Sequence, residues 1–135
     1  LEMPGLQDAN GSGFSLSFSP DGSLLAVASS GNLVLWELAT DTFEVAVTSA
    51  STDSLAFSAD GKMLALGGRR SGTMWALGQR DDVILLDVAT LQPVRRLVGG
   101  GRAMDIAVSP DGTKVAAGAR DHTVTLWHLD EGAVR

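Results

Sequence analysis

Three aspartates in a recurring tetrapeptide are the most conspicuous candidates for chemistry. "SPDG" occurs at residues 19–22 and 109–112, and "SADG" occurs at residues 58–61. Carboxylates brought together by a fold can act as general acids and bases or bind a metal ion. Each of these aspartates, however, precedes a glycine and lies between two apolar runs, which is typical of a tight turn. We therefore interpret Asp21, Asp60 and Asp111 as turn residues.

The other chemical candidates have weaker patterns. His122 and His128 are the only histidines, cysteine is absent, and no carboxylate pair stands at ligand spacing, so no zinc site is expected. Neither histidine lies beside a plausible serine nucleophile. "GGGR" at residues 99–102 lacks the Lys-Ser/Thr pair of a phosphate-binding loop, which favours a flexible connector. We predict a protein that is not an enzyme and has no cofactor and no metal.

Composition narrows the class of partner. The 135 residues carry a net charge of −6 and only ten Lys and Arg, which argues against nucleic acid. No apolar run approaches the ~20 residues that cross a membrane.

No signal peptide is visible, and although the sequence does not specify a compartment, we expect the cytoplasm rather than secretion. High Ala and Gly with no Cys or Tyr fits a bacterial source.

The three turns mark an internal repeat. An apolar run precedes each turn ("FSLSF", "DSLAF", "MDIAV"), a second follows it, and a third comes later as "LVLWEL", "VILLDV" or "VTLWHL". These runs are short, rich in Val, Leu, Phe and Ala, and bounded by turn residues, so they predict strands. A weaker fourth run, at residues 43–48 and 93–98, completes the unit, and the third unit ends within it.

The strands are apolar on both sides, which predicts sheets stacked face to face. Small residues recur in the first strand of each unit, at Ser17, Ala56 and Ala107, and we expect this small side to let neighbouring sheets approach. Trp36 and Trp127, in the third strands, are expected to pack in the core. A single β-sandwich is the alternative, but a sandwich gives no reason for a repeat of about 40 residues.

The repeat resembles the WD-repeat β-propellers. The resemblance is carried by "FSPDG" between the first two strands, by "LVLWEL" and "VTLWHL" in the third strand, and by Asp121 in the turn before it. It implies an all-β fold of about three four-stranded antiparallel blades. The repeats are degenerate, because the family's Gly-His is absent and Leu86 replaces the tryptophan of the second unit. The resemblance therefore implies blades held mainly by apolar packing rather than by the family's buried polar network.

The repeat also predicts domain boundaries. Residues 1–13 form an N-terminal remnant or linker, residues 14–50 blade 1, residues 51–101 blade 2 with an insertion at about 69–81, and residues 102–135 blade 3 with a truncated last strand. Three blades make an incomplete ring, since propellers have about four to eight. We expect either the missing blades of a longer chain or homo-oligomerisation to complete it.

The insertion of the second unit is the candidate binding site. Its Trp, Met and Arg side chains have the composition of an interface hot spot, and the resemblance places the loop on the rim that carries the blade connectors. The predicted contact residues are Arg69, Arg70, Met74, Trp75, Leu77, Arg80 and Arg102. The sequence thus predicts a non-catalytic scaffold that binds a protein or peptide through its loop rim, although the insertion could instead only pack on its own blade. The alternative is part of a propeller enzyme or small-molecule sensor with a site in the central channel, lined by Ser15, Ser17, Ser54 and Asp105.

Overall fold

Antiparallel strands make up the fold of the computed structural model, which describes residues 15–70, 83–97, 103–119 and 122–129. The strands are β1 (Ser15–Phe18), β2 (Leu24–Glu37), β3 (Thr42–Phe57), β4 (Met63–Arg70), β5 (Val83–Asp87), β6 (Gln92–Leu97), β7 (Ala103–Val108), β8 (Lys114–Ala119) and β9 (Val124–His128). Strands β1 to β6 pair in chain order and form one six-stranded sheet. Strands β7 to β9 pair in chain order and form a second sheet. The described residues contain no helix long and apolar enough to cross a membrane. The predicted all-β class is confirmed.

The repeated tetrapeptide closes the first hairpin of each unit through one shared set of hydrogen bonds. In the first copy, the Ser19 hydroxyl donates to Asp21 Oδ1 at 2.8 Å and accepts from the Leu24 amide at 3.0 Å. The Ser23 amide also donates to Asp21 Oδ1, at 2.9 Å. Gly22 follows with φ +77°, a conformation that glycine adopts without steric cost. The turns at residues 58–63 and 109–114 repeat these contacts.

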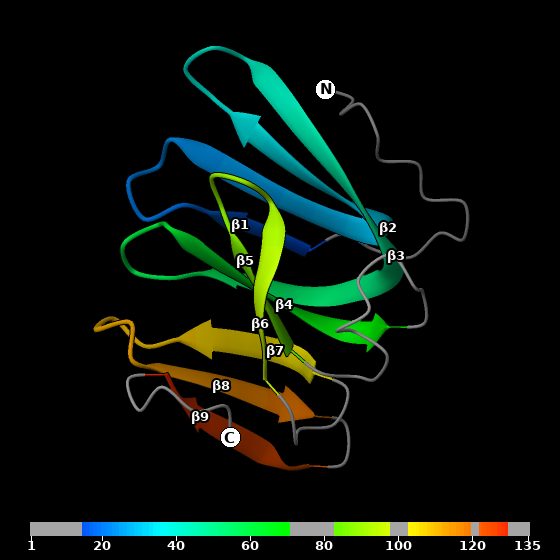
Figure 1. Cartoon of the computed structure of the whole chain (residues 1–135), viewed down its shortest axis with the longest axis vertical. Helices are drawn as coiled ribbons and strands as arrows, with labels where there is room; N and C mark the ends of the chain where they lie inside the picture. The colour runs from blue at the N-terminus through cyan, green and yellow to red at the C-terminus, as the bar shows by residue number, and fades with distance from the viewer. Residues whose placement is uncertain (1–14, 71–82, 98–102, 120–121, 130–135) are drawn as a thin grey trace.

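Strands β2 and β3 are long because each passes through a bend that separates two predicted strands (Figure 1). The Leu38 amide donates to Ser23 O at 3.0 Å, so the end of β2 lies beside its own beginning. The same bond joins Val88 to Lys62 in the second unit and Leu129 to Thr113 in the third. The second and third predicted strands of the first unit therefore form a hairpin, as they do in the other units.

Three stacked blades follow from these pairings. Blade 1 consists of β1, β2 and residues 42–47 of β3; blade 2 consists of residues 54–57 of β3 with β4, β5 and β6; blade 3 consists of β7, β8 and β9. In Figure 1 they lie in chain order from the blue and cyan strands to the orange and red ones. The fourth strand expected in blade 3 lies outside the described residues. The boundaries drawn from the sequence stay a prediction.

Two apolar cores lie between the blades. Blades 1 and 2 share a core that includes Leu33, Leu35, Leu64, Ile84 and Leu86. Blades 2 and 3 share a second, built from Ala65, Val83, Leu85, Leu97, Ile106, Val115, Ala117 and Trp127. Blade 2 supplies side chains to both, which explains why its strands are apolar at nearly every position.

Each blade has one shallow face and one bulky face. The shallow face points toward the next blade in the chain and pairs small residues across its first two strands, as in Ser17 with Ala26 and Ala56 with Ala65. The bulky face points toward the preceding blade and pairs large residues, as in Leu55 with Leu66. A shallow face thus receives a bulky one at both inner interfaces, which is how the small first-strand residues allow close approach.

Candidate interaction surfaces

The shallow face of blade 3 is open. Leu126 stands where blades 1 and 2 have Leu35 and Leu85, because it pairs with Ala116 as Leu85 pairs with Ala65. Leu35 and Leu85 are buried, whereas Leu126 is 49% exposed. Val124 is 76% exposed, although its counterparts Leu33 and Val83 are buried. The difference arises because no described blade lies beyond blade 3.

The bulky face of blade 1 is open along its first strand. Leu16 and Phe18 are 61% and 63% exposed, whereas the residues in the same places on blade 2, Leu55 and Phe57, are buried. Val27 and Val34 of β2 also belong to this face, but they are buried. The accessible large apolar side chains of this face are therefore Leu16 and Phe18 on β1 and Val45, which pairs with Val34, on β3.

The carboxylates of the three predicted turn aspartates accept hydrogen bonds within their own turns. Hydrogen bonds from the Ser23 amide, the Ser23 hydroxyl and the Ser19 hydroxyl lower the pKa of Asp21 to about 2. A hydroxyl bond from Ser58 is the main cause that lowers the pKa of Asp60. The Ser109 hydroxyl does the same for Asp111. These carboxylates stay ionised at neutral pH, and each lies in its own hairpin. Within the described residues, no group of three or more His, Asp or Glu could hold a metal ion.

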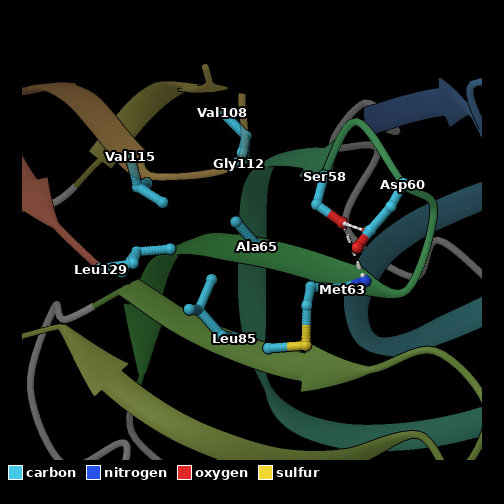
Figure 2. A pocket seen from close by; sticks show the side chains of 9 residues that line it. All are labelled: Ser58, Asp60, Met63, Ala65, Leu85, Val108, Gly112, Val115 and Leu129. Carbon is cyan, nitrogen blue, oxygen red and sulfur yellow. Dashed lines mark hydrogen bonds between the residues drawn. The ribbon is translucent and has the colours of Figure 1, made fainter. Parts of the chain in front are cut away.

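Two hollows that described residues line lie between the blades near the turns. The one between blades 2 and 3 has a volume of about 80 Å³ and is lined mainly by apolar side chains, with Met63 and Leu85 facing Val108 and Val115 (Figure 2). The other lies between blades 1 and 2, has a volume of about 200 Å³, and includes Glu37 and Glu44. Both are smaller than the ~300–1,000 Å³ of typical small-molecule sites.

The predicted contact residues fall largely outside the described structure. Arg69 and Arg70 are the last two residues of β4, where they pair with Ser51 and Ala50 of β3. Met74, Trp75, Leu77, Arg80 and Arg102 lie outside the described residues. The structure therefore does not test whether these side chains come together.

The polar residues assigned to a channel lie on the shallow faces of their blades. Ser54 precedes Ala56 by two positions, so both point toward blade 3, and Ser54 is buried. Its hydroxyl is, within the described part of the chain, the buried side-chain polar atom that has no hydrogen-bond partner. Asp105 occupies the matching place on blade 3 and is exposed. These positions alternate with the first-strand residues of the apolar cores, which gives the channel alternative little support.

A polar contact of Trp36 was not predicted from the sequence. Its indole Nε1 donates to Asp41 Oδ1 at 2.9 Å, and its ring stacks on Phe43 with centroids 5.4 Å apart. Asp41 has φ 55°, so the turn conformation brings its carboxylate back toward the indole. The "ATDTF" stretch indicates a turn, but nothing in it predicts which partner Asp41 takes.

Comparison with protein families supports the repeat reading. Residues 10–37 and 91–128 match the family described as WD domain, G-beta repeat. The first match ends with β2, and the second runs from the start of the outer strand of blade 2 through β9. No curated protein matches the chain. WD40 repeats generally mediate protein–protein interactions, and the family is typically non-catalytic. These two regions match WD40 repeats, and the antiparallel sheets of the structure are consistent with WD-repeat blades.

Proposed function

We propose that the chain is a non-catalytic propeller scaffold that binds a protein or peptide through its loop rim. The observation that carries the proposal is the match of residues 10–37 and 91–128 to WD40 repeats, within blades that pack as a stack. A stack with two apolar cores is a rigid support, and loops on rigid supports commonly carry binding residues.

The proposed contact surface is the insertion of blade 2 together with the connector to blade 3. Its residues are Arg69, Arg70, Met74, Trp75, Leu77, Arg80 and Arg102. Arg and Trp are enriched in interface hot spots, because each combines a large contact area with directed polar groups. Arg69 and Arg70 support this choice, since they end β4 at the place where the insertion begins.

We also propose that the scaffold works as part of a closed ring. The open faces of blades 1 and 3 expose apolar side chains that their counterparts in blade 2 bury. The blades that cover these faces come either from a longer chain or from another copy of this one.

Affinity capture tests the proposed contact surface. Wild-type protein, Trp75→Ala and the control Val94→Ala would each be used as bait, and bound proteins would be compared by mass spectrometry. Val94 is a suitable control because it is exposed on β6 and is not one of the proposed contact residues. We expect Trp75→Ala to lose the partners retained by the other two baits while its Tm stays within about 2 °C of wild type.

Two outcomes would argue against this function. Retention of the same partners by Trp75→Ala would show that the insertion does not bind them. A fall in Tm of about 10 °C or more would show that Trp75 packs on its own blade, as a buried tryptophan does.

A further inference from the structure

The two open faces differ in shape, and each inner interface shows what covers a face of its kind. The shallow face of blade 2 is covered by the bulky face of blade 3, where Ala65 and Leu85 share a core with Ile106 and Trp127. The bulky face of blade 2 is covered by the shallow face of blade 1, where Ala26 and Leu35 share a core with Leu64 and Leu86. The same pairing of face types therefore occurs twice in one chain.

The chain presents one open face of each type. Blade 3 offers a shallow face with Ala107, Ala116 and Gly118 on its first two strands and Val124 and Leu126 on its third. Blade 1 offers a bulky face on which Leu16, Phe18 and Val45 are accessible, whereas Val27 and Val34 are already buried within the same copy. A second copy of the chain thus carries Leu16 and Phe18 on its blade 1, in the places that Ile106 and Val108 occupy on the face that blade 2 accepts from blade 3.

We infer that two copies of this chain associate head to tail, with the shallow face of blade 3 of each copy against the bulky face of blade 1 of the other. This inference rests on the proposed closed ring and names the partner that completes it. Heterologous contacts of this kind close into a ring when the rotation per unit permits and otherwise give filaments. Two copies give six blades, which lies within the usual range of about four to eight.

The charges at the two faces permit the contact. Asp105 is the charged residue on the inner part of the shallow face of blade 3, and β1, Ser15–Phe18, contains no charged residue. No like charge on β1 therefore opposes Asp105. Lys114 and His128 pair at the turn end of blade 3, on the same face as Ala116 and Leu126.

The mass of the 135-residue chain in solution gives the first test. Light scattering coupled to size exclusion, repeated over a hundredfold range of concentration, should show a species with twice the 14.0 kDa of one chain. A monomer at every concentration would overturn the inference. An unlimited series of larger species would overturn the closed ring.

Two arginine substitutions test the direction of the contact. Phe18→Arg alters the bulky face and Leu126→Arg the shallow face, and both side chains are exposed, so each variant should fold. Because both contacts of a closed pair use both faces, each variant alone should raise the dissociation constant by about 100-fold or more. Val94→Arg on blade 2 is the matched control and should leave the dissociation constant unchanged.

Mixing the two variants separates head-to-tail contact from the alternatives. The Phe18→Arg copy keeps its shallow face and the Leu126→Arg copy keeps its bulky face, so one contact can form between them. We expect the mixture to contain a heterodimer that neither variant forms alone, with circular dichroism spectra like the wild type. Dimers of Leu126→Arg alone, or no heterodimer in the mixture of folded variants, would overturn the inference. Neither result depends on the insertion, so a failure here leaves the capture experiment on Trp75 unaffected.

Discussion

Trp36 and Trp127 occupy the same position in two blades, opposite Leu25 and Val115, yet Trp127 is 1% exposed and Trp36 remains partly exposed. Both point toward the preceding blade. For Trp127 that blade is present, and its ring packs in the core that blades 2 and 3 share. For Trp36 the described contacts are local, with Asp41 and Phe43. The contribution of the third-strand tryptophan to stability therefore depends on whether a preceding blade covers it.

Replacement of each tryptophan by alanine should separate these environments. Trp127→Ala is expected to lower the free energy of unfolding by about 3–5 kcal/mol, because it leaves a cavity between two blades. Trp36→Ala should cost only about 1–2 kcal/mol, the value of an exposed hydrogen bond and a ring contact. Urea unfolding at a dilution where the chain is monomeric measures both.

Trp127→Leu is the control for the tryptophan prediction. Blade 2 has Leu86 at this position and buries it completely, so leucine should recover part of the loss. Equal costs for the two alanine variants would contradict the stacking described above.

The serine that begins each turn should contribute more to the free energy of unfolding than the residue that follows the glycine of the turn. Ser58 donates to Asp60 Oδ1 at 2.7 Å and accepts from the Met63 amide at 3.0 Å, so Ser58→Ala removes two hydrogen bonds. We expect a loss of about 1–3 kcal/mol by urea unfolding. Ser23→Ala should cost less than about 1 kcal/mol, since Lys62 stands in the matching place of blade 2 and that turn closes through its backbone. A larger effect of Ser23→Ala would refute this order.

The turn carboxylates predict a loss of stability in acid. The pKa of Asp21 in the fold is about 2, below its ordinary 3.8, so the stabilising contribution is fully present above pH 3.8. It disappears as the pH falls from 3.8 toward 2, because the unfolded chain then takes up the proton first. NMR titration of the three carboxyl carbons should give midpoints below 3.8 for Asp21, Asp60 and Asp111. Midpoints at or above 3.8 would mean that the turn hydrogen bonds do not form in solution.

Alanine substitution should change stability differently at two glycines, although both have room for a Cβ atom. A Cβ at Gly112 or at Gly118 would meet no atom within 4 Å, but Gly112 has φ +73°. Gly112→Ala should therefore cost about 1–2 kcal/mol through backbone strain alone. Gly118→Ala should be neutral or stabilise by up to about 1 kcal/mol, and blade 1 already has Ala28 in that place. Thermal unfolding of the pair checks the difference, and similar Tm values would exclude the strain explanation.

The local parts of the fold could be predicted from the sequence. The Ser-x-Asp-Gly turns, the strand runs and the burial of the blade 2 strands on both faces depend on residues close together in the chain. The sequence also predicts the small side of the first strand, at Ala56, because strand alternation fixes which residues share a face.

Other features depend on contacts that a pattern does not specify. The bends that make β2 and β3 continuous were not foreseen, since short runs separated by Ser, Gly and Asn indicate separate strands. Leu91 adopts φ 56° while its side chain is buried, although an apolar residue gives no signal for a left-handed conformation. The Trp36–Asp41 bond likewise requires knowledge of the turn geometry. The proposed contacts in the insertion stay a prediction.

Because each blade has one shallow face and one bulky face, neighbouring blades can stack in only one orientation. A unit copied in tandem by duplication of its coding DNA arrives in the orientation that its neighbours already accept. An added blade therefore needs no new complementary surface. Substitutions such as Leu86 in place of tryptophan are tolerated where the side chain is still large enough to pack against the shallow face of the preceding blade.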